Sequence, residues 1–233
     1  MGLRASNRTA FEFTKSDIRL MPSPRPRRPR ADTPDKRALI LEAAAQVFAD
    51  VGLEGASLRA VAARAGYAPA ALYFHFASKE ALYAEVLMAS LARLGAATIA
   101  DSDADRCAVT RLKAAAMAFF TYYADHPRDL DLGFYLFRGG MKPAGLGRDR
   151  DEALNSALEA ALAPIERAAI DLGTSRDEAR LLTVDIFAHA AGLLLLLHTG
   201  RIRMFGASAP HMMERYITEK TAALLKGTAH ADT

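Results

Sequence analysis

The sequence predicts an all-α protein with an N-terminal three-helix head and a larger helical body. Apolar residues recur at helical spacing from residue 36 onwards, and a glycine separates two short helices near residue 66. No segment shows the sustained alternation that is typical of a β-strand. With 233 residues, 51% of them hydrophobic, the chain is long enough for one or two compact domains with a sizeable core.

The first predicted helix spans residues 36–52. Its apolar residues share one helical face: Leu39, Ile40, Ala43, Ala44, Val47 and Phe48. Thr33 can cap this helix with Pro34 in its first turn, and Gly52 suits its end because glycine tolerates a positive φ.

Two shorter helices follow. The second carries Leu58, Val61, Ala62 and Ala65 and stops at Gly66, and the third begins near Pro69 and turns Leu72 and Phe76 inward. Two short helices with a glycine at the corner indicate a helix-turn-helix, which places its second helix in the major groove of DNA. The sequence therefore predicts a DNA-binding head.

In their order along the sequence, the residues of this head resemble the TetR (tetracycline-repressor) family of bacterial regulators over residues 36–83. The matching positions are Ile40, Ala43, Ala44, Phe48, Gly52, Ser57, Val61, Ala62, Ala65, Gly66, Leu72, Tyr73, His75, Phe76, Lys79, Glu80 and Leu82. Ala68 departs from the pattern, because the family often has Ser or Thr there as a cap for the recognition helix. Pro69 in the first turn offsets part of that loss.

The resemblance implies which residues touch DNA. Phosphate contacts would come from Ser57, Tyr73, His75 and Lys79, and base reading from Arg59, Ala68, Pro69, Ala70 and Ala71. Arginine can pair with guanine, and small apolar side chains can meet a thymine methyl group. Tyr73 could instead pack inside the head, but Leu72 and Phe76 already supply the inward positions, which favours a hydroxyl that faces phosphate.

Charge is distributed unevenly. The net charge is +3, yet residues 1–31 alone carry +6, so the remainder sums to −3. We expect residues 1–34 to be a disordered basic tail rich in Pro and Arg, which is either an inert leader or an arm with weak, salt-sensitive DNA contact. Met21 offers an alternative start of the chain.

Residues 35–80 are then the DNA-binding domain, residues 81–227 a helical effector-binding and dimerisation domain, and residues 228–233 a short tail. Ser78 can cap a helix that connects head and body. Further helices are expected at about 105–125, 128–138, 150–172, 176–199 and 210–227. The resemblance implies that the last two form a homodimer interface, and the stretch Leu193–Leu197, apolar all round, also needs covering on every side.

The body holds more aromatic and methionine side chains than helix packing requires, which favours an apolar pocket with a few polar anchors. We expect an apolar or amphipathic effector near Phe120, Tyr123, Phe137 and His189. Asp185 and His189 lie one helical turn apart, either as a buried hydrogen-bonded pair or as polar points of that pocket.

No cofactor, metal or catalytic site is expected. Asp101, Asp103 and Asp105 lack the later Gly and Glu of a calcium loop, and the glycines at 139–147 lack the context of a phosphate-binding loop. Cys107 has no evident His partner and, as the single cysteine, fits a reducing cytosol. With neither a secretory pattern nor an apolar run near the ~18 residues of a membrane span, the sequence predicts a cytoplasmic protein without a membrane partner.

The sequence thus predicts a ligand-responsive transcriptional regulator that is not an enzyme. It is expected to repress by binding a palindromic operator as a dimer, and to be released by a small effector. Activation, an all-helical interaction protein without a DNA role, and an all-helical enzyme are the alternatives.

Overall fold

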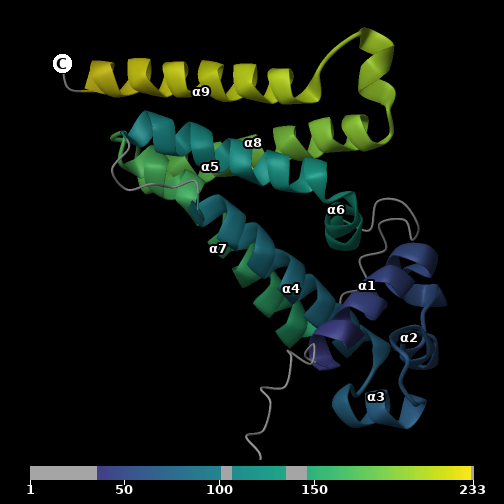
Figure 1. Cartoon of the computed structure of the whole chain (residues 1–233). Coiled ribbons are helices and arrows are strands. Elements are labelled where there is room, and N and C mark those ends of the chain that lie inside the picture. The colour runs from purple at the N-terminus through teal and green to yellow at the C-terminus, as the bar shows by residue number, and fades with distance from the viewer. Residues whose placement is uncertain (1–35, 101–106, 135–145, 232–233) are drawn as a thin grey trace, which may run out of the picture. The chain divides into compact units, whose positions relative to one another are not determined.

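The computed structural model describes residues 36–100, 107–134 and 146–231, and every regular element among them is helical. The order of the elements is α1 (Lys36–Gly55), α2 (Leu58–Ala65), α3 (Pro69–His75), α4 (Lys79–Ala100), α5 (Ala108–Asp125), α6 (Pro127–Phe134), α7 (Arg148–Ile170), α8 (Arg176–His198), the 3-10 helix η1 (Arg201–Phe205) and α9 (Ala209–Ala231). The all-α prediction is confirmed, and Figure 1 shows α1–α3 as a head at one end of α4 and α7. The predictions for the tail, Thr33 and Pro34 fall outside the described residues.

The first helix is kinked at Gly52. That residue takes a φ of 70°, as its expected role requires, but one more turn to Gly55 follows it. The buried face is the predicted one except for Leu39, which was expected to point inward and is 36% exposed. Leu39 lies in the first turn of α1, and the buried residues of the helix begin at Ile40.

The corner of the helix-turn-helix is built by local capping. The Ser57 hydroxyl accepts a hydrogen bond from the Ala60 amide at 3.1 Å and so starts α2. Gly66 ends α2 in the left-handed conformation, with a φ of 74° that a side chain would strain. Ala68 gives α3 no side-chain cap and Pro69 occupies its first turn, as expected.

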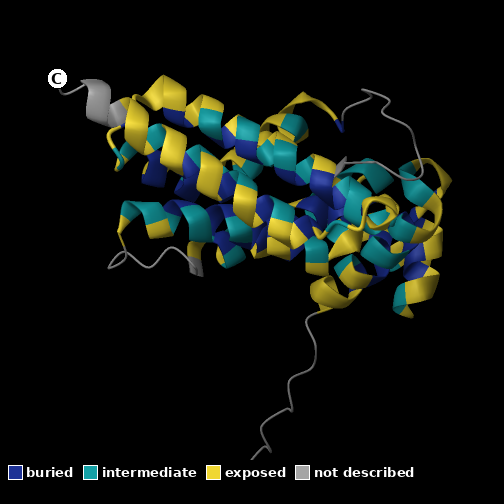
Figure 2. Cartoon of the chain, turned by 90° about the horizontal axis from the view of Figure 1, so that it is seen from above, coloured by how far each residue is buried: buried dark blue, intermediate teal, exposed yellow. Residues whose placement is uncertain are grey.

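Two apolar clusters hold the described chain together. The head cluster joins α1, α2 and α3 to the start of α4 through residues such as Phe48, Leu72 and Leu82. The body cluster joins α4, α5, α7, α8 and α9 around Phe119 and Phe120, which are at most 1% exposed. Figure 2 shows the buried residues running through both.

The short helix α6 contributes to both clusters. Leu130 is buried in the body cluster, whereas Leu132 is buried in the head cluster. The buried Tyr83 hydroxyl of α4 donates a hydrogen bond to the Leu132 carbonyl at 2.6 Å. Figure 1 places α6 next to α1, and α6 contacts α1, α4 and α5. Head and body are therefore joined by α4 and by this two-turn helix.

Helices α8 and α9 lie along one side of the body (Figure 1). Two helical segments, Lys79–Ile99 and Arg176–His198, are long and apolar enough to cross a membrane by length and composition alone. Helices in the core of a soluble protein also meet that test. In the second segment only 28% of the apolar window is buried inside this chain, so much of its apolar surface is left uncovered.

Candidate nucleic-acid interface and effector pocket

The outer face of α3 is unusually rich in exposed side chains. Leu72 and Phe76 are buried, at 0% and 2% exposure, as the sequence predicts. Tyr73 is 60% exposed, so it is not part of the three-helix core, and His75 is exposed beside it. Ala68, Pro69 and Ala70 are also exposed, whereas Ala71 is half-buried. The helix can therefore present its first turn and its tyrosine to a partner.

Phe74 was missed by the sequence analysis. It is 86% exposed, the highest value among the exposed large hydrophobic residues that the structure describes, and its ring meets His75 edge-on at 5.4 Å. The helical spacing contained the signal, because a residue two positions from both Leu72 and Phe76 must point away from the core. A bare aromatic ring on this face is a candidate base or sugar contact.

The remaining candidate DNA contacts differ in whether their side chains already make hydrogen bonds within the protein. Arg59 is exposed on α2, and Ser57 is used as the cap of the same helix. The Lys79 ammonium donates hydrogen bonds to the carbonyl oxygens of Leu53 and Glu54 at 2.9 and 3.1 Å. Lys79 therefore fastens the start of α4 to the end of α1, and a phosphate would have to share it with these carbonyls.

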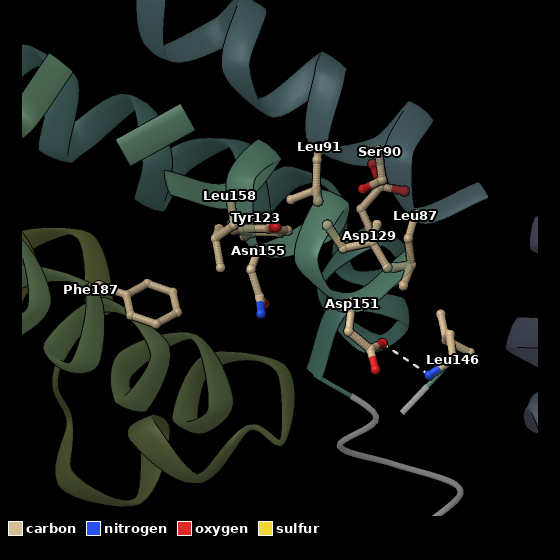
Figure 3. A pocket seen from close by; sticks show the side chains of 12 residues that line it. Leu87, Ser90, Leu91, Tyr123, Asp129, Leu146, Asp151, Asn155, Leu158 and Phe187 are labelled. Carbon is tan, nitrogen blue, oxygen red and sulfur yellow. Dashed lines mark hydrogen bonds between the residues drawn. The ribbon is translucent and has the colours of Figure 1, made fainter. Parts of the chain in front are cut away.

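The body contains a pocket of about 620 Å³ between α4, α5, α6, α7 and α8. Its lining is Leu87, Ser90, Leu91, Tyr123, Asp129, Gly133, Leu146, Asp151, Leu154, Asn155, Leu158 and Phe187. Figure 3 shows these side chains converging from separate helices on one space. The size lies within the ~300–1,000 Å³ that is usual for small-molecule sites, and the mixture of leucines with a few polar groups is also typical of them.

Of the four residues that the sequence suggested for an effector, Tyr123 lines this pocket. Phe120 lies instead in the body cluster, 1% exposed, and Phe137 falls outside the described residues. His189 stacks on Tyr216 of α9 with ring centroids 3.7 Å apart, and burial lowers its pKa. Asp185, expected near His189, forms an ion pair with Lys220 and not with the histidine.

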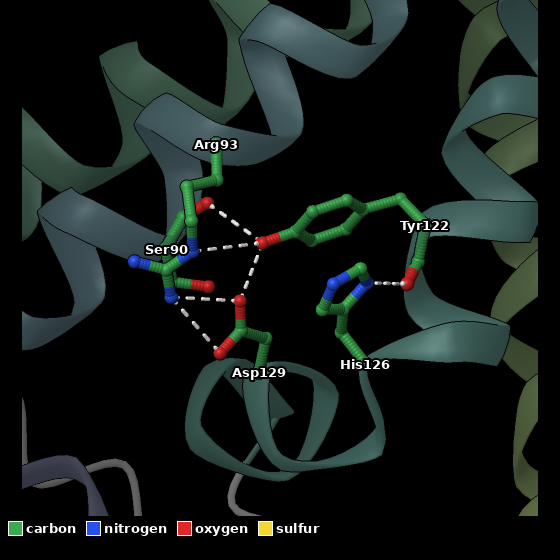
Figure 4. A network of polar contacts seen from close by, with 5 residues as sticks. All are labelled: Ser90, Arg93, Tyr122, His126 and Asp129. Atoms are coloured by element: carbon green, nitrogen blue, oxygen red, sulfur yellow. Dashed lines mark hydrogen bonds and ion pairs between the residues drawn. The ribbon is translucent and has the colours of Figure 1, made fainter. Parts of the chain in front are cut away.

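A polar network lies where α4, α5 and α6 meet (Figure 4). The Arg93 guanidinium donates to both carboxylate oxygens of Asp129, at 3.1 and 2.9 Å, and to the Tyr122 hydroxyl at 3.3 Å. Tyr122 donates a short hydrogen bond to Asp129, and the His126 ring stacks on the Tyr122 ring at 4.4 Å. This set ties α6 to α4.

The network fixes the protonation of its members. Burial alone would raise the pKa of Asp129, but the hydrogen bonds from Tyr122 and Arg93 outweigh it, so the pKa lies below the ordinary value. Burial and the bond to Asp129 raise the pKa of Tyr122. At neutral pH an ionised Asp129 is therefore held between a neutral phenol and a guanidinium. Asp129 also lines the pocket, so the network and the pocket share one carboxylate.

A helix-turn-helix head joined to a helical body with a ligand-sized pocket defines a DNA-binding transcriptional regulator. Residues 40–86, which span the head and the start of α4, match the family model of bacterial regulatory proteins, tetR family, so the head is a DNA-binding domain of that type. No curated protein sequence is significantly similar to it.

Solved structures with the same architecture cover most of the chain. A regulatory protein of the tetR family from Rhodococcus RHA1 is 20% identical, with a TM-score of 0.63, covering 83% of this chain and 98% of its own. FadR from Bacillus subtilis, in complex with stearoyl-CoA, is 16% identical, with a TM-score of 0.61 and coverages of 82% and 98%. The fatty acid degradation regulator FadR from Bacillus halodurans is 18% identical, with a TM-score of 0.60 and coverages of 84% and 98%. These likenesses establish the fold.

Proposed function

We propose that the chain is a homodimeric repressor that binds a palindromic operator and is released from it by a small amphipathic effector in the pocket. The observation that carries the proposal is the position of α6. Asp129 on this helix lines the pocket, while Leu132, three residues on, is buried in the head cluster. A ligand that displaces α6 therefore disturbs the packing of the DNA-binding head directly.

The DNA contacts follow from the exposed surface of the head. Tyr73, His75 and Ser57 would meet phosphates with α3 in the major groove, and Lys79 would add its charge while it holds α1. Arg59 and the first turn of α3 from Ala68 to Ala71 would read bases, with Phe74 as an added apolar contact. The region 36–80 has a net charge of only +1, so affinity depends on these directed contacts and on dimerisation.

The uncovered side of α8 and α9 supplies the dimer interface in this proposal. Leu181 and Val184 on α8 are 69% and 56% exposed, and Leu225 on α9 is 43% exposed. Apolar surface of this kind on neighbouring helices favours burial against a second copy. The dimer would set the separation of its two recognition helices near one turn of DNA, about 34–36 Å, or a multiple of it.

The Arg93–Asp129 contact provides a route from the pocket to the head. Arg93 belongs to α4, which begins at Lys79 directly after the recognition helix. A ligand that engages Asp129 competes with Arg93, loosens α6 from α4 and changes the state of the head. Coupling of this kind is typically worth about 1–3 kcal/mol, and operator binding must weaken ligand binding by the same factor.

The solved relative supports an effector of some kind. FadR from Bacillus subtilis holds stearoyl-CoA within the same architecture, so a helical body of this fold can accommodate an amphipathic small molecule. The cytosol is the expected compartment, because both the operator and the lone reduced cysteine belong there.

The test is a mobility shift of the full chain on the DNA upstream of its own gene, with selection from a random DNA library in parallel. Arg59→Ala should relax the preference at one base position, whereas the exposed Arg176→Ala on α8 serves as a control and should leave the site unchanged. A chain that selects no site from the library has no operator, which would leave the interaction-protein and enzyme alternatives. A reporter that loses transcription when the gene is deleted would indicate an activator.

A further inference from the structure

The pocket is acidic. Its charged lining residues are Asp129 and Asp151, and the described part of the lining contains no Lys, Arg or His. Leucines and the Phe187 ring make up most of the remaining wall. A ligand that fills this space thus meets an apolar surface and carboxylates together. No described lining residue is a cation, and the two guanidinium groups next to the lining are already engaged, Arg93 with Asp129 and Arg150 with the Leu146 carbonyl.

The two carboxylates are engaged to different extents. Asp129 has its charge opposed by Arg93 and accepts from Tyr122 as well. Asp151 accepts a hydrogen bond from the Leu146 amide at 2.9 Å through Oδ1, and no described residue donates to its Oδ2. It lies in the first turn of α7 and at the pocket wall. Asp151 therefore offers a ligand one carboxylate oxygen that no described residue engages.

The polar and apolar groups are also separated in space. Asp151 and Leu146 lie at the end of α7 nearest the head cluster, and Leu158 lies about two turns further along the same helix. Figure 3 shows the Phe187 ring facing the space from the side away from Asp151. The cavity thus has a carboxylate end towards the head and an apolar end away from it.

The charge selects the ligand. A carboxylate or phosphate group at this end would lie against the Asp151 carboxylate in a partly desolvated space, which is unfavourable for both groups, while Asp129 is already paired with Arg93. A protonated amine would instead donate charge-assisted hydrogen bonds to Asp151 and, at close approach, compete with Arg93 for Asp129. The leucine wall would hold an alkyl or aryl body.

We propose that the effector is a cationic amphiphile: an apolar body with a protonated amine that binds Asp151 and reaches Asp129. This inference rests on the proposed function, since it places the effector in the same pocket. It distinguishes the chain from its structural relative, whose bound stearoyl-CoA is an anionic amphiphile.

The test compares three probes with one alkyl chain, namely dodecylammonium, dodecanoate and dodecanol. Each is titrated into the full chain by calorimetry below its micelle concentration. Dodecylammonium should bind at least about tenfold more tightly than either of the others, as expected for a charge-assisted hydrogen bond in a partly buried site. Dodecanoate or dodecanol binding as tightly as the ammonium, or none of the three binding, would overturn the proposal.

Two matched variants locate the site. Asp151→Asn keeps the shape and should weaken dodecylammonium about tenfold or more, while its effect on dodecanol stays small. Asp149→Asn removes an equal charge from the same first turn, but that residue is exposed and outside the pocket, so its effect should stay below about twofold. Equal effects of the two variants would mean that the preference is a general surface attraction, which refutes the site.

The two proposals fail separately. Calorimetry needs no DNA, so cation preference and its loss in Asp151→Asn can be measured even if the chain has no operator. If the ammonium binds as predicted but leaves the mobility shift on the selected operator unchanged, the ligand class stands and the repressor mechanism is wrong. If dodecanoate binds and releases the operator, the mechanism stands and the ligand class is wrong.

Discussion

The head and the body of this chain carry their functions in different ways. The candidate DNA surface is a continuous segment, residues 57–79, in which capping and spacing decide what is exposed. The candidate pocket is assembled from five helices, and its two carboxylates are 22 positions apart in the sequence. A local site can be recognised from the order of its residues, whereas a distributed site depends on how helices pack.

The largest effect is expected for Phe120→Ala. Phe120 is 1% exposed in the body cluster, so its truncation should leave a cavity and lower the free energy of unfolding by about 3–5 kcal/mol. Affinity for any pocket ligand should change little in the fraction that remains folded. Chemical denaturation followed by circular dichroism measures the free energy of unfolding, and calorimetry measures the affinity for the ligand. A stable variant with lost ligand binding would place Phe120 in the pocket, as its sequence position suggested.

Asp129→Asn tests the link between head and body. It should lower the free energy of unfolding by about 1–3 kcal/mol at pH 7, because Arg93 and Tyr122 lose an ionised acceptor. The pKa of Asp129 is lower in the folded chain, so its contribution is present above the ordinary Asp value of about 3.9 and disappears as the pH falls through the folded value. Denaturation at pH 7 and at pH 3 should show the difference shrinking, and an equal difference at both would mean that Asp129 is not held ionised.

Within the head, Lys79 also holds two helices together, whereas the Tyr73 side chain is exposed. Lys79→Ala should lower the salt slope of DNA binding by about one, and it should also cost about 1 kcal/mol of stability because two carbonyls of α1 lose their donor. Tyr73→Phe should weaken DNA binding with no change of stability, since the hydroxyl is exposed. Salt-dependent mobility shifts and thermal melts separate the two variants. Loss of stability without loss of affinity in Lys79→Ala would make that lysine purely structural.

The smallest predicted effect is a gain. Ala68→Ser supplies the side-chain cap that α3 lacks, and it should add about 0.5–1 kcal/mol to the stability of the chain. The melting temperature should rise by a few degrees at most. Ala77→Ser, an exposed change at the other end of α3, is the matched control and should have no such effect. A loss of operator affinity with intact stability would show that the Ala68 methyl group is itself a base contact.

Much of the head could be predicted from the sequence. The three helices of the head, the glycine corner and the missing cap follow from short-range rules, and the structure has them within a few residues. Gly52 takes the positive φ that was expected of it and interrupts the helix there, but the sequence analysis did not foresee the further turn up to Gly55. Phe74 could have been found by the same spacing argument.

The pocket was less accessible to sequence reasoning. Aromatic content suggested a pocket in the body but could not say which residues line it. Phe120 and Tyr123, only three positions apart on α5, are both buried in the body cluster, and of the two Tyr123 alone also lines the pocket. The sequence did not predict Asp129 and Asp151 as pocket residues, because isolated acidic residues near helix starts are common on protein surfaces. Their meaning depends on contacts between elements that no local pattern specifies.

Because α6 packs in both the head cluster and the body cluster, it limits how the head could be transferred to another protein. A chimera that grafts residues 35–80 onto a different body would leave Leu132 and Leu146 behind, although both are buried against the head. The grafted head would then expose the apolar surface that Leu132 and Leu146 cover here. A short helix of the new body would have to cover that surface instead. A chimera that keeps the head of this chain intact therefore needs three segments: the head itself, α6, and the residues just before α7.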